Sequence, residues 1–191
     1  MSFLTEKEIQ QLGFLEIGEN VLISRKASLY NCGNIKIGSN VRIDDYCVLS
    51  AGAGGITLGS YIHIAVYTSL IGAGKIVLAD FCNISSKVAI YSSNDDYSGV
   101  SLTNPTISSK FTNVTNADVY IGKHVIVGSG SVILPGIVLN DGVAIGALSF
   151  VNKSCEAFSI YVGNPAKKIK ERKRDLLLLE EQFLASINNV S

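Results

Sequence analysis

The chain lacks an excess of charge of either sign, which limits the partners it can have. Lysine and arginine total 16 residues, aspartate and glutamate total 16, and the formal net charge is zero. A protein without a global positive field is not drawn to nucleic acid or to an anionic membrane surface. We therefore expect no nucleic-acid partner, and we expect any polyanionic ligand to be bound by a local group of residues.

Long apolar runs are also missing, although 47% of the residues are hydrophobic. No segment approaches the roughly 18 consecutive apolar residues of a membrane span. The N-terminus, MSFLTEKEIQ, becomes charged too early for a signal peptide. The sequence predicts a cytoplasmic protein without stable membrane insertion, and its 191 residues are enough for one well-cored domain.

Cysteine is too scattered for a zinc or redox motif. The four cysteines, Cys32, Cys47, Cys82 and Cys155, lie far apart without a CxxC pair or a nearby histidine. We therefore predict no metal site. Free cysteine behaves as a small hydrophobe, so Cys47, Cys82 and, by extension, Cys155 are expected to be packed thiols.

An aliphatic residue recurs at every sixth position over much of the chain. From residue 121 the repeat is Ile121, Val127, Ile133, Leu139, Ile145 and Val151, and upstream it forms three groups: Ile37, Ile43 and Leu49; Leu58, Ile64 and Leu70; Leu78, Ile84 and Ile90. A period of six fits neither a helix nor simple strand alternation. Three strand-and-turn units per coil predict a triangular solenoid whose inward aliphatic residues form one column.

The segments IGKHVIVGSGSVILPGIVLNDGVAIGALSFV and YVGNPAKKIK resemble the hexapeptide-repeat acyltransferases over roughly residues 15 to 170. This resemblance implies an all-β solenoid, a left-handed parallel β-helix, that forms a homotrimer. It also implies acyl-CoA as a co-substrate, held in the groove between neighbouring subunits, with no permanently bound cofactor.

Both ends have the sequence features of caps that would cover the open ends of the solenoid. TEKE, residues 5 to 8, predicts a capping box at the start of a short helix that stops near Gly13. After Pro165, an apolar side containing Leu176 to Leu179 and Phe183 predicts a C-terminal helix. We expect a β-helix domain with its helical cap over residues 1–164, an external loop over 92–118 and the C-terminal helix over 165–191.

The external loop carries the candidate chemistry. Many members of the family place a histidine in or near this loop as a base, but here the segment from Ser92 to Gly99 contains Asp95 and Asp96 instead. A neutral amine needs less help from a base than a sugar hydroxyl does, so a carboxylate is sufficient to hold its ammonium form and accept its proton. Asp95 and Asp96 are the predicted catalytic residues, although aspartate is also common in turns.

Other residues complete the predicted acceptor site. Ser86 is a candidate to orient the nucleophile, and four further residues are candidates for substrate binding: Ser85, Tyr91, Asn94 and Tyr97. The SSNDDYSG loop, FLTEKEIQQLGF and RIDDYCVLS most resemble the branch of the family that acts on nucleotide-linked amino sugars, especially dTDP-4-amino-4,6-dideoxyglucose. The resemblance therefore implies N-acylation of a dTDP-linked 4-amino sugar with an acetyl or short hydroxyacyl group, for surface polysaccharide or lipopolysaccharide O-antigen synthesis.

Small residues and lysines near the C-terminal end of the solenoid are the candidates for CoA binding. Gly146 and Ala147 would permit close approach of the pantetheine or thioester. GNPAKK matches the family's terminal GxPAK motif, which assigns Pro165, Ala166, Lys167 and Lys168 to the nucleotide end of CoA. On its own, this charge run would be expected to be a solvated surface.

Two alternatives stay open from the sequence. An O-acetyltransferase would use His63 or His124 from an adjacent subunit as the base. His63 directly precedes the inward Ile64 and should point outward, near Asp44 and Asp45 of the previous coil. A non-catalytic β-helix scaffold is the other alternative. A carbonic-anhydrase-like zinc site would need three histidines, and the chain has two.

Overall fold

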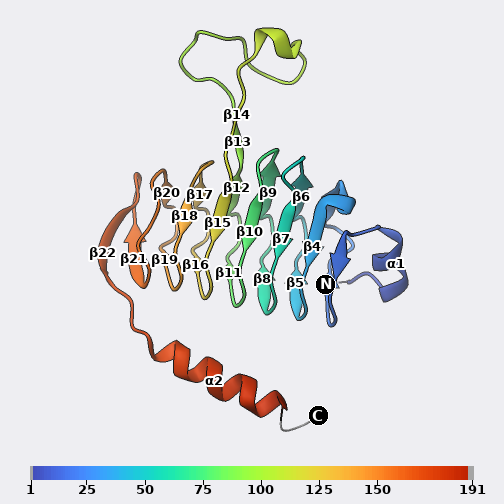
Figure 1. Ribbon diagram of the computed structural model, residues 1–191, viewed down its shortest axis with the longest axis vertical. Coiled ribbons are helices and arrows are strands. Elements are labelled where there is room, and N and C mark those ends of the chain that lie inside the picture. The colour runs from blue at the N-terminus through green and yellow to red at the C-terminus, as the bar shows by residue number, and fades with distance from the viewer. Residues whose placement is uncertain (1, 189–191) are drawn as a thin grey trace.

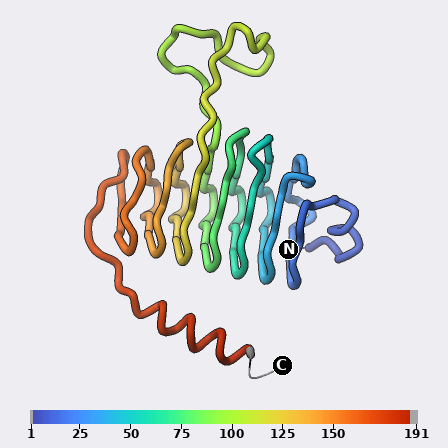
Figure 2. The backbone as a smooth tube through the Cα atoms, in the orientation of Figure 1, coloured from blue at the N-terminus to red at the C-terminus, as the bar shows by residue number. Residues whose placement is uncertain are grey.

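The protein is a stack of coils, each turning through three short parallel strands, as the computed structural model of residues 2–188 shows (Figure 1). Equivalent strands of successive coils pair side by side and build three sheets along the stack. The tube in Figure 2 shows the coils following one another in chain order, with one long excursion near the middle. The predicted parallel β-helix is confirmed.

Within residues 2–188 the three sheets contain six, eight and six strands. The first sheet comprises β1 (Glu16–Ile17), β4 (Ile35–Ile37), β7 (Ile56–Leu58), β10 (Ile76–Leu78), β15 (Val119–Ile121) and β18 (Val138–Leu139). The second comprises β2 (Leu22–Ile23), β5 (Val41–Ile43), β8 (Ile62–Ile64), β11 (Asn83–Ile84), β16 (Ile126–Val127), β19 (Ala144–Ile145), β21 (Ser159–Val162) and β22 (Lys167–Glu171). The third comprises β3 (Ser28–Tyr30), β6 (Val48–Ala51), β9 (Ser69–Gly72), β12 (Ala89–Tyr91), β17 (Val132–Ile133) and β20 (Phe150–Val151).

The six-residue repeat forms the core, as predicted. Every aliphatic member of the repeat is at most 3% exposed, and these side chains belong to one continuous hydrophobic cluster. Each fully buried aliphatic side chain contributes about 1.5–3 kcal/mol relative to an exposed one. The aliphatic column therefore fills the prism, and binding sites must form on its outside.

The three corners of the prism are tight turns that use left-handed backbone. We call the turn between the first and second sheets the first corner, that between the second and third the second corner, and that between the third and first the third corner. Tyr61, Phe81 and His124 take φ values of 58°, 60° and 60° at the first corner. Tyr67 and Lys87 take 62° at the second. Residues other than glycine rarely adopt this backbone, and at the first corner the rings of Tyr61, Phe81 and His124 stack on one another from coil to coil.

Glycine is required directly after the aliphatic repeat because neighbouring coils approach closely. A Cβ atom on Gly38 would lie 2.6 Å from the carbonyl oxygen of Gly59, and one on Gly128 would lie 2.5 Å from the backbone nitrogen of Ala147. These glycines do not have positive φ values. Their role is to let the next coil pack closely.

The N-terminal cap is confirmed. Helix α1 (Glu6–Gln11) has Thr5 at its N-cap, where the Thr5 hydroxyl accepts a hydrogen bond from the Glu8 backbone and the Glu8 carboxylate accepts one from the Thr5 backbone. Ile9 is 6% exposed and joins the core, and Gly13 has a φ of 67° just after the helix ends. The helix thus covers the first coils.

The C-terminal segment differs from the prediction of a helix from residue 165. Lys167–Glu171 forms β22, which pairs antiparallel with β21, and helix α2 (Asp175–Asn188) begins only afterwards. The reason is that β21 would otherwise leave a row of unpaired backbone groups at the end of the second sheet. The last part of the predicted helix, residues 189–191, lies outside the described residues.

The external loop leaves the prism after β12, as expected. It begins and ends as a two-stranded antiparallel ribbon, β13 (Ser93–Asn94) with β14 (Thr115–Asn116), and carries a short 3₁₀ helix, η2 (Ser109–Phe111). A second 3₁₀ turn, η1 (Cys32–Asn34), lies near the N-terminal end. Figure 1 shows the loop extending away from the coils. No helix within residues 2–188 is long and apolar enough to cross a membrane.

Candidate active site

The two aspartates of the external loop have different environments. Asp96 accepts hydrogen bonds from the backbone nitrogens of Ser98 at 2.8 Å and Ser101 at 3.0 Å. Hydrogen bonds from Ser98, and then those from Ser101, lower the pKa of the Asp96 carboxyl below its ordinary value. A lower pKa makes a carboxylate a weaker base. Asp96 therefore has the geometry of a residue that shapes the loop.

Asp95 is exposed, and its carboxylate accepts no comparable hydrogen bonds from the described residues. Its carboxylate makes no hydrogen bond or ion pair with any residue between positions 2 and 188. A carboxylate without internal partners is available to a ligand, and exposure leaves room for an ammonium group beside it. Of the two aspartates, Asp95 has the geometry of a candidate base.

Ser85 and Ser86 lie at the second corner, directly after β11, and both are half-buried. Their backbones are fixed by the stacking of coils: the Ser85 nitrogen donates to the Val127 carbonyl at 2.9 Å, and the Ser86 carbonyl accepts from Gly130 at 3.0 Å. Neither hydroxyl bonds another side chain or carbonyl within the described part of the chain. Both hydroxyls thus stand on a rigid turn and are available to a ligand.

A single chain does not bring these serines and the aspartates together. Ser86 lies before β12 and the loop starts beyond its other end, at the third corner. Six residues of extended chain from Ser86 to Ser92 span roughly 20 Å. No hydrogen bond joins either serine to either aspartate among residues 2–188. Within one chain, Ser85 and Ser86 thus lie before β12 at the second corner, and Asp95 and Asp96 lie in the loop that starts at the third corner.

The remaining substrate-binding candidates lie on the path into the loop. Tyr91 ends β12 and is half-buried, and Asn94 pairs with Thr115 in the ribbon. Tyr97 is 87% exposed beyond it. The three residues follow one another outward from the prism, and Tyr97 contacts no aromatic ring in the described residues.

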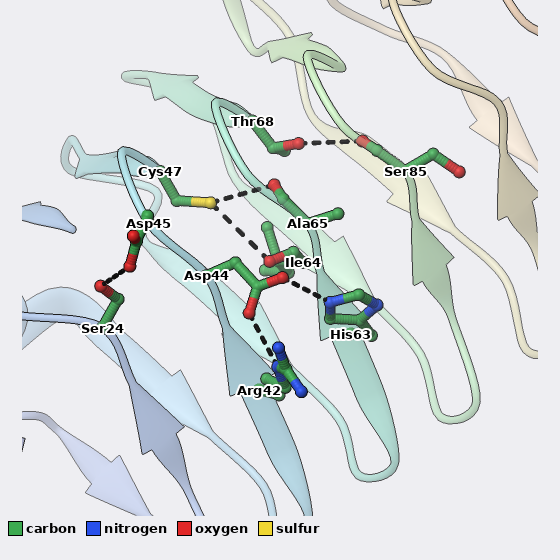
Figure 3. A network of polar contacts seen from close by, with 10 residues as sticks. All are labelled: Ser24, Arg42, Asp44, Asp45, Cys47, His63, Ile64, Ala65, Thr68 and Ser85. Atoms are coloured by element: carbon green, nitrogen blue, oxygen red, sulfur yellow. Dashed lines mark hydrogen bonds and ion pairs between the residues drawn. The ribbon is translucent and has the colours of Figure 1, made fainter. Parts of the chain in front are cut away.

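His63 belongs to a polar network on the outer face of the second sheet (Figure 3). Its Nε2 atom lies 2.9 Å from Oδ2 of Asp44, and Nε of Arg42 donates to Oδ1 of the same carboxylate at 2.7 Å. Asp44 is only 5% exposed. Burial acts to raise the pKa of Asp44, but the hydrogen bonds from His63 and Arg42 outweigh it, and the pKa lies below its ordinary value.

His63 thus points outward beside Asp44 of the previous coil, as the sequence predicts. Asp45 faces different partners: the Ser24 hydroxyl, with which it makes a very short hydrogen bond, and Lys26 at 3.3 Å. Hydrogen bonding by Ser24, opposed in part by burial, lowers the pKa of Asp45 with further help from Lys26. The two neighbouring carboxylates therefore serve separate clusters.

His124 is occupied by the C-terminal helix. Its Nε2 atom lies 2.7 Å from Oε2 of Glu180, its ring stacks on Phe81 with centroids 5.1 Å apart, and its side chain is only 10% exposed. Phe183 packs edge-on against Tyr61 at 5.4 Å. A shallow cleft of about 400 Å³ lies between α2 and this corner, lined by Tyr61, Phe81, His124, Leu176, Leu179, Glu180 and Phe183. The contacts of His124 with Glu180 and of Tyr61 with Phe183 hold α2 on the prism.

The cysteines are packed thiols, as predicted. All four are buried and unpaired. Burial raises the pKa of Cys47 to about 11, that of Cys82 to about 12 and that of Cys155 to about 11. Thiols with such values are protonated near neutral pH and are poor nucleophiles.

The residues predicted to bind CoA lie in two places. Gly146 and Ala147 lie at the second corner after β19, and Pro165 to Lys168 lie in the turn after β21 and at the start of β22. Gly146 is half-buried and Ala147 is exposed, and the close approach of Val162 leaves no room for a Cβ atom on Gly146. The Asn164–Pro165 peptide bond is cis, and Ala166 packs against the core. Of these four residues, Ala147 and Pro165 are exposed, and Gly146 and Ala166 are half-buried.

The two lysines of this segment differ. Lys168 Nζ lies 2.8 Å from Glu156 and 2.6 Å from Glu171, and hydrogen bonds to these two carboxylates raise its pKa. Lys167 is exposed and forms no ion pair within residues 2–188. Both lie on strand β22, whereas the sequence predicted the start of a helix at these positions.

Sequence reasoning missed three side chains that shape these sites: Arg42, Asn83 and Glu180. Arg42 and Asn83 stand beside His63 only because the strands pair in a particular register. The length of a coil could have revealed Arg42 and Asn83, because residues one coil apart in the sequence become neighbours on adjacent strands, as Arg42 and His63 do. The described residues contain no cluster of three or more metal-ligating side chains.

No family model matches this chain. A dTDP-4-amino-4,6-dideoxy-D-glucose acyltransferase of Escherichia coli is 56% identical over 186 residues, covering 97% of each chain. AntD, an N-acyltransferase from Bacillus cereus, solved in complex with dTDP and 3-hydroxybutyryl-CoA, superposes with a TM-score of 0.93 at 50% identity and covers 98% of each chain.

A variant of AntD solved with dTDP-4-amino-4,6-dideoxyglucose and coenzyme A gives a TM-score of 0.92 at 50% identity and covers 97% of this chain and 98% of AntD. Identity at this level along nearly the whole chain covers the prism, the external loop and both ends. The chain is an acyltransferase, and it belongs to the family of the dTDP-4-amino-4,6-dideoxy-D-glucose acyltransferases.

Proposed function

We propose that the protein transfers an acyl group from acyl-CoA to the amine of dTDP-4-amino-4,6-dideoxyglucose. The similarity to the Escherichia coli enzyme along 97% of both chains carries this proposal. In the reaction the amine attacks the thioester carbonyl, an amide forms, the C–S bond breaks and free CoA leaves with the proton that the amine gave up. The acyl group is acetyl or a short hydroxyacyl chain, such as the 3-hydroxybutyryl group of the CoA ester bound to AntD.

Asp95 is the proposed base of this reaction. Its carboxylate is exposed and uncommitted, whereas Asp96 is bonded to the backbone of its own loop. AntD has also been solved as variants in which one aspartate or one serine is replaced, the first with dTDP and coenzyme A and the second with dTDP-4-amino-4,6-dideoxyglucose and coenzyme A. Asp95 holds the ammonium form of the substrate and then accepts its proton, while Asp96 fixes the loop that carries it.

Ser86, with Ser85 beside it, orients the amine or donates a hydrogen bond to the oxyanion that develops on the thioester carbonyl. Tyr91, Asn94 and Tyr97 lie next to Asp95 along the chain and are proposed contacts of the sugar. Gly146, Ala147, Pro165 and Ala166 are proposed contacts of CoA. Lys167 and Lys168 are proposed to bind its phosphates, Lys167 as the lysine without an internal ion pair.

We propose that the active unit is a homotrimer with active sites between subunits. The serine corner and the loop carboxylates of one chain stand at different corners of the prism, so a neighbouring subunit must supply one of the two sets. A loop that extends away from its own coils, as in Figure 1, suits that role. The reaction is placed in the cytoplasm, where acyl-CoA and nucleotide sugars occur together, and it serves surface glycan synthesis.

O-acetyl transfer is the weaker candidate, because His124 is bonded to Glu180 under α2 and His63 is bonded to Asp44. A thiol-release assay with acetyl-CoA and 3-hydroxybutyryl-CoA separates the candidates when dTDP- and UDP-linked 4-amino sugars are compared with the corresponding hydroxy sugars. We expect turnover with the dTDP-linked amino sugar. Turnover only with a hydroxy sugar, or none with any acceptor, would contradict the proposal.

A further inference from the structure

Three hydrogen-bond donors stand in one row on the outer face of the second sheet. Arg42 of β5 pairs in register with His63 of β8, and His63 pairs in register with Asn83 of β11. Neighbouring strands lie about 4.8 Å apart, so the three side chains leave the sheet at that spacing. Beyond Asn83 the same row continues with Ile126 and Ala144, which are apolar. These three donors are therefore neighbours in the N-terminal half of the sheet, separated by Ile126, Ala144 and Ile160 from Lys170 of β22 in the same row.

The buried carboxylate of Asp44 fixes two of the three donors. It accepts from Nε of Arg42 on one oxygen and lies within hydrogen-bond distance of Nε2 of His63 with the other. Because an ionised carboxylate only accepts hydrogen bonds, Nε2 of His63 carries the proton. The second ring nitrogen of His63 points away from Asp44 in Figure 3. One acidic group thus holds a guanidinium and an imidazole side by side in fixed orientations.

Both oriented side chains remain accessible. The Arg42 side chain is 47% exposed and that of His63 is 43% exposed, whereas the Asp44 side chain between them is 6% exposed. Side chains that are already ordered lose less conformational entropy when a ligand binds. A guanidinium, together with an imidazole ring in its doubly protonated form, presents N–H groups at a spacing of about 5 Å that match the oxygen atoms of neighbouring phosphates, which charge-assisted hydrogen bonds recognise.

The last of the three donors, Asn83, lies next to the proposed acceptor site. Asn83 lies two residues before Ser85, about 7 Å along the strand. Asn83 is the first residue of β11, and Ser85 begins the second corner. In a nucleotide-linked sugar, the diphosphate is joined directly to the sugar. A diphosphate on the donor row would therefore place its sugar at the corner that carries Ser85 and Ser86.

We propose that Arg42, His63 and Asn83 bind the diphosphate of the nucleotide-linked acceptor, and that Asp44 is the positioning residue of this subsite. The inference rests on the proposed function, because it names the group that recognises the acceptor in that reaction. It assigns His63 to binding phosphate and not to removing a proton from the nucleophile. The subsite distinguishes an acceptor with two phosphates from the free sugar.

Calorimetric titration with dTDP, thymidine and CoA tests the subsite on the full-length protein. We expect His63→Ala and Asn83→Ala each to weaken dTDP binding about 10-fold or more, because each removes a charged or polar bond to phosphate. Thymidine and CoA should bind these variants as they bind the wild type. Thr57→Ala is the matched control, because Thr57 is the outward, half-buried residue of β7 in the same coil. It should leave all three affinities unchanged.

Steady-state kinetics of Asp44→Asn tests the positioning role. We expect the KM for the dTDP-sugar to rise about 10-fold with little change in kcat or in the KM for acyl-CoA, because only acceptor binding depends on the oriented pair. A loss of kcat at unchanged KM would contradict the assignment. Intact folding is checked through CoA affinity, which a misfolded variant would also lose.

The subsite and the proposed function fail in different ways. Wild-type dTDP affinity in both His63→Ala and Asn83→Ala, with active N-acyl transfer, would overturn the subsite alone. Absence of transfer to any dTDP-linked amine, with dTDP affinity still lost in both variants, would overturn the acceptor and leave a diphosphate site. UDP is the second probe, because it has the diphosphate of dTDP on a different nucleoside. Weaker UDP binding by both variants than by the wild type would identify a diphosphate site.

Discussion

The Nε2 atom of His124 lies 2.7 Å from Oε2 of Glu180, and this pair joins helix α2 to the first corner of the prism. Lys123 Nζ contacts the other carboxylate oxygen of Glu180 at 2.5 Å. Phe183 lies one turn further along α2 and meets Tyr61 and Phe81 edge-on. The helix is therefore held by polar contacts at Glu180 and aromatic contacts at Phe183, and three of the prism residues that provide them, Tyr61, Phe81 and His124, have left-handed backbone.

Glu180→Gln should loosen this contact at neutral pH. Burial acts to raise the pKa of Glu180, but hydrogen bonds from Lys123 and His124 outweigh it and lower the pKa below the ordinary value of 4.5. A lowered folded-state pKa means that ionised Glu180 stabilises the folded protein above that ordinary value, and that this stabilisation is lost as the pH falls through the folded-state pKa. Charged hydrogen bonds of this kind contribute about 1.5–3 kcal/mol.

We therefore expect Glu180→Gln to lose about 1.5–3 kcal/mol in denaturant titrations at pH 7, and to lose much less at pH 3. The neighbouring Glu181 is exposed, and Glu181→Gln is the matched control. Equal stability of Glu180→Gln and the wild type at pH 7 would show that the pair does not hold α2. Protection of the α2 amides from hydrogen exchange measures the undocking directly.

The core could be predicted from the sequence because each inward position is specified by one residue type at a fixed interval. Ile64 and Ile84 are buried wherever the coils stack, and a six-residue period has few other structural solutions. The outer surface could not be predicted in the same way. Arg42 meets His63 only through strand register, which depends on how many residues each corner uses.

Two local features escaped prediction for reasons of tertiary structure. Lys167–Glu171 has a composition that suits a helix, but the open edge of β21 pairs with it as a strand. The left-handed backbone of Phe81 and His124 is unfavourable for side chains taken alone, and stacking between coils stabilises it. In both cases the partner lies in a different coil, and the local sequence does not contain it.

Asp95→Asn and Asp96→Asn should differ in their effects on catalysis. An amide cannot accept the proton of the amine, so Asp95→Asn should lower kcat by about 10²- to 10⁴-fold. Asp96→Asn keeps one of the two oxygens that accept from Ser98 and Ser101 and leaves the proposed base in place, so we expect a loss of less than about 10-fold. Single-turnover acyl transfer with saturating acyl-CoA measures the chemical step. Full activity of Asp95→Asn would exclude it as the base.

The buried thiols should take no part in the reaction. With pKa values of about 11 for Cys47, about 12 for Cys82 and about 11 for Cys155, these groups are almost wholly protonated at pH 8. We expect Ellman's reagent to label them only after unfolding, and iodoacetamide at pH 8 to leave acyl transfer unchanged. Rapid labelling that abolishes activity would contradict direct transfer from CoA to the amine.

A complementation experiment tests whether each site draws residues from two subunits. Ser86 and Asp95 stand at opposite ends of β12 in one chain, and the proposed trimer joins the serine corner of one subunit to the loop of the next. Ser86→Ala and Asp95→Asn trimers, each inactive or nearly so, are unfolded and refolded together in equal amounts. Random assembly then gives about a quarter of the sites both wild-type residues, because the two come from different chains. We expect about a quarter of wild-type activity in the mixture and none in either variant refolded alone. If both residues came from the same chain, every site would keep one substitution, and the mixture would stay as inactive as its parts.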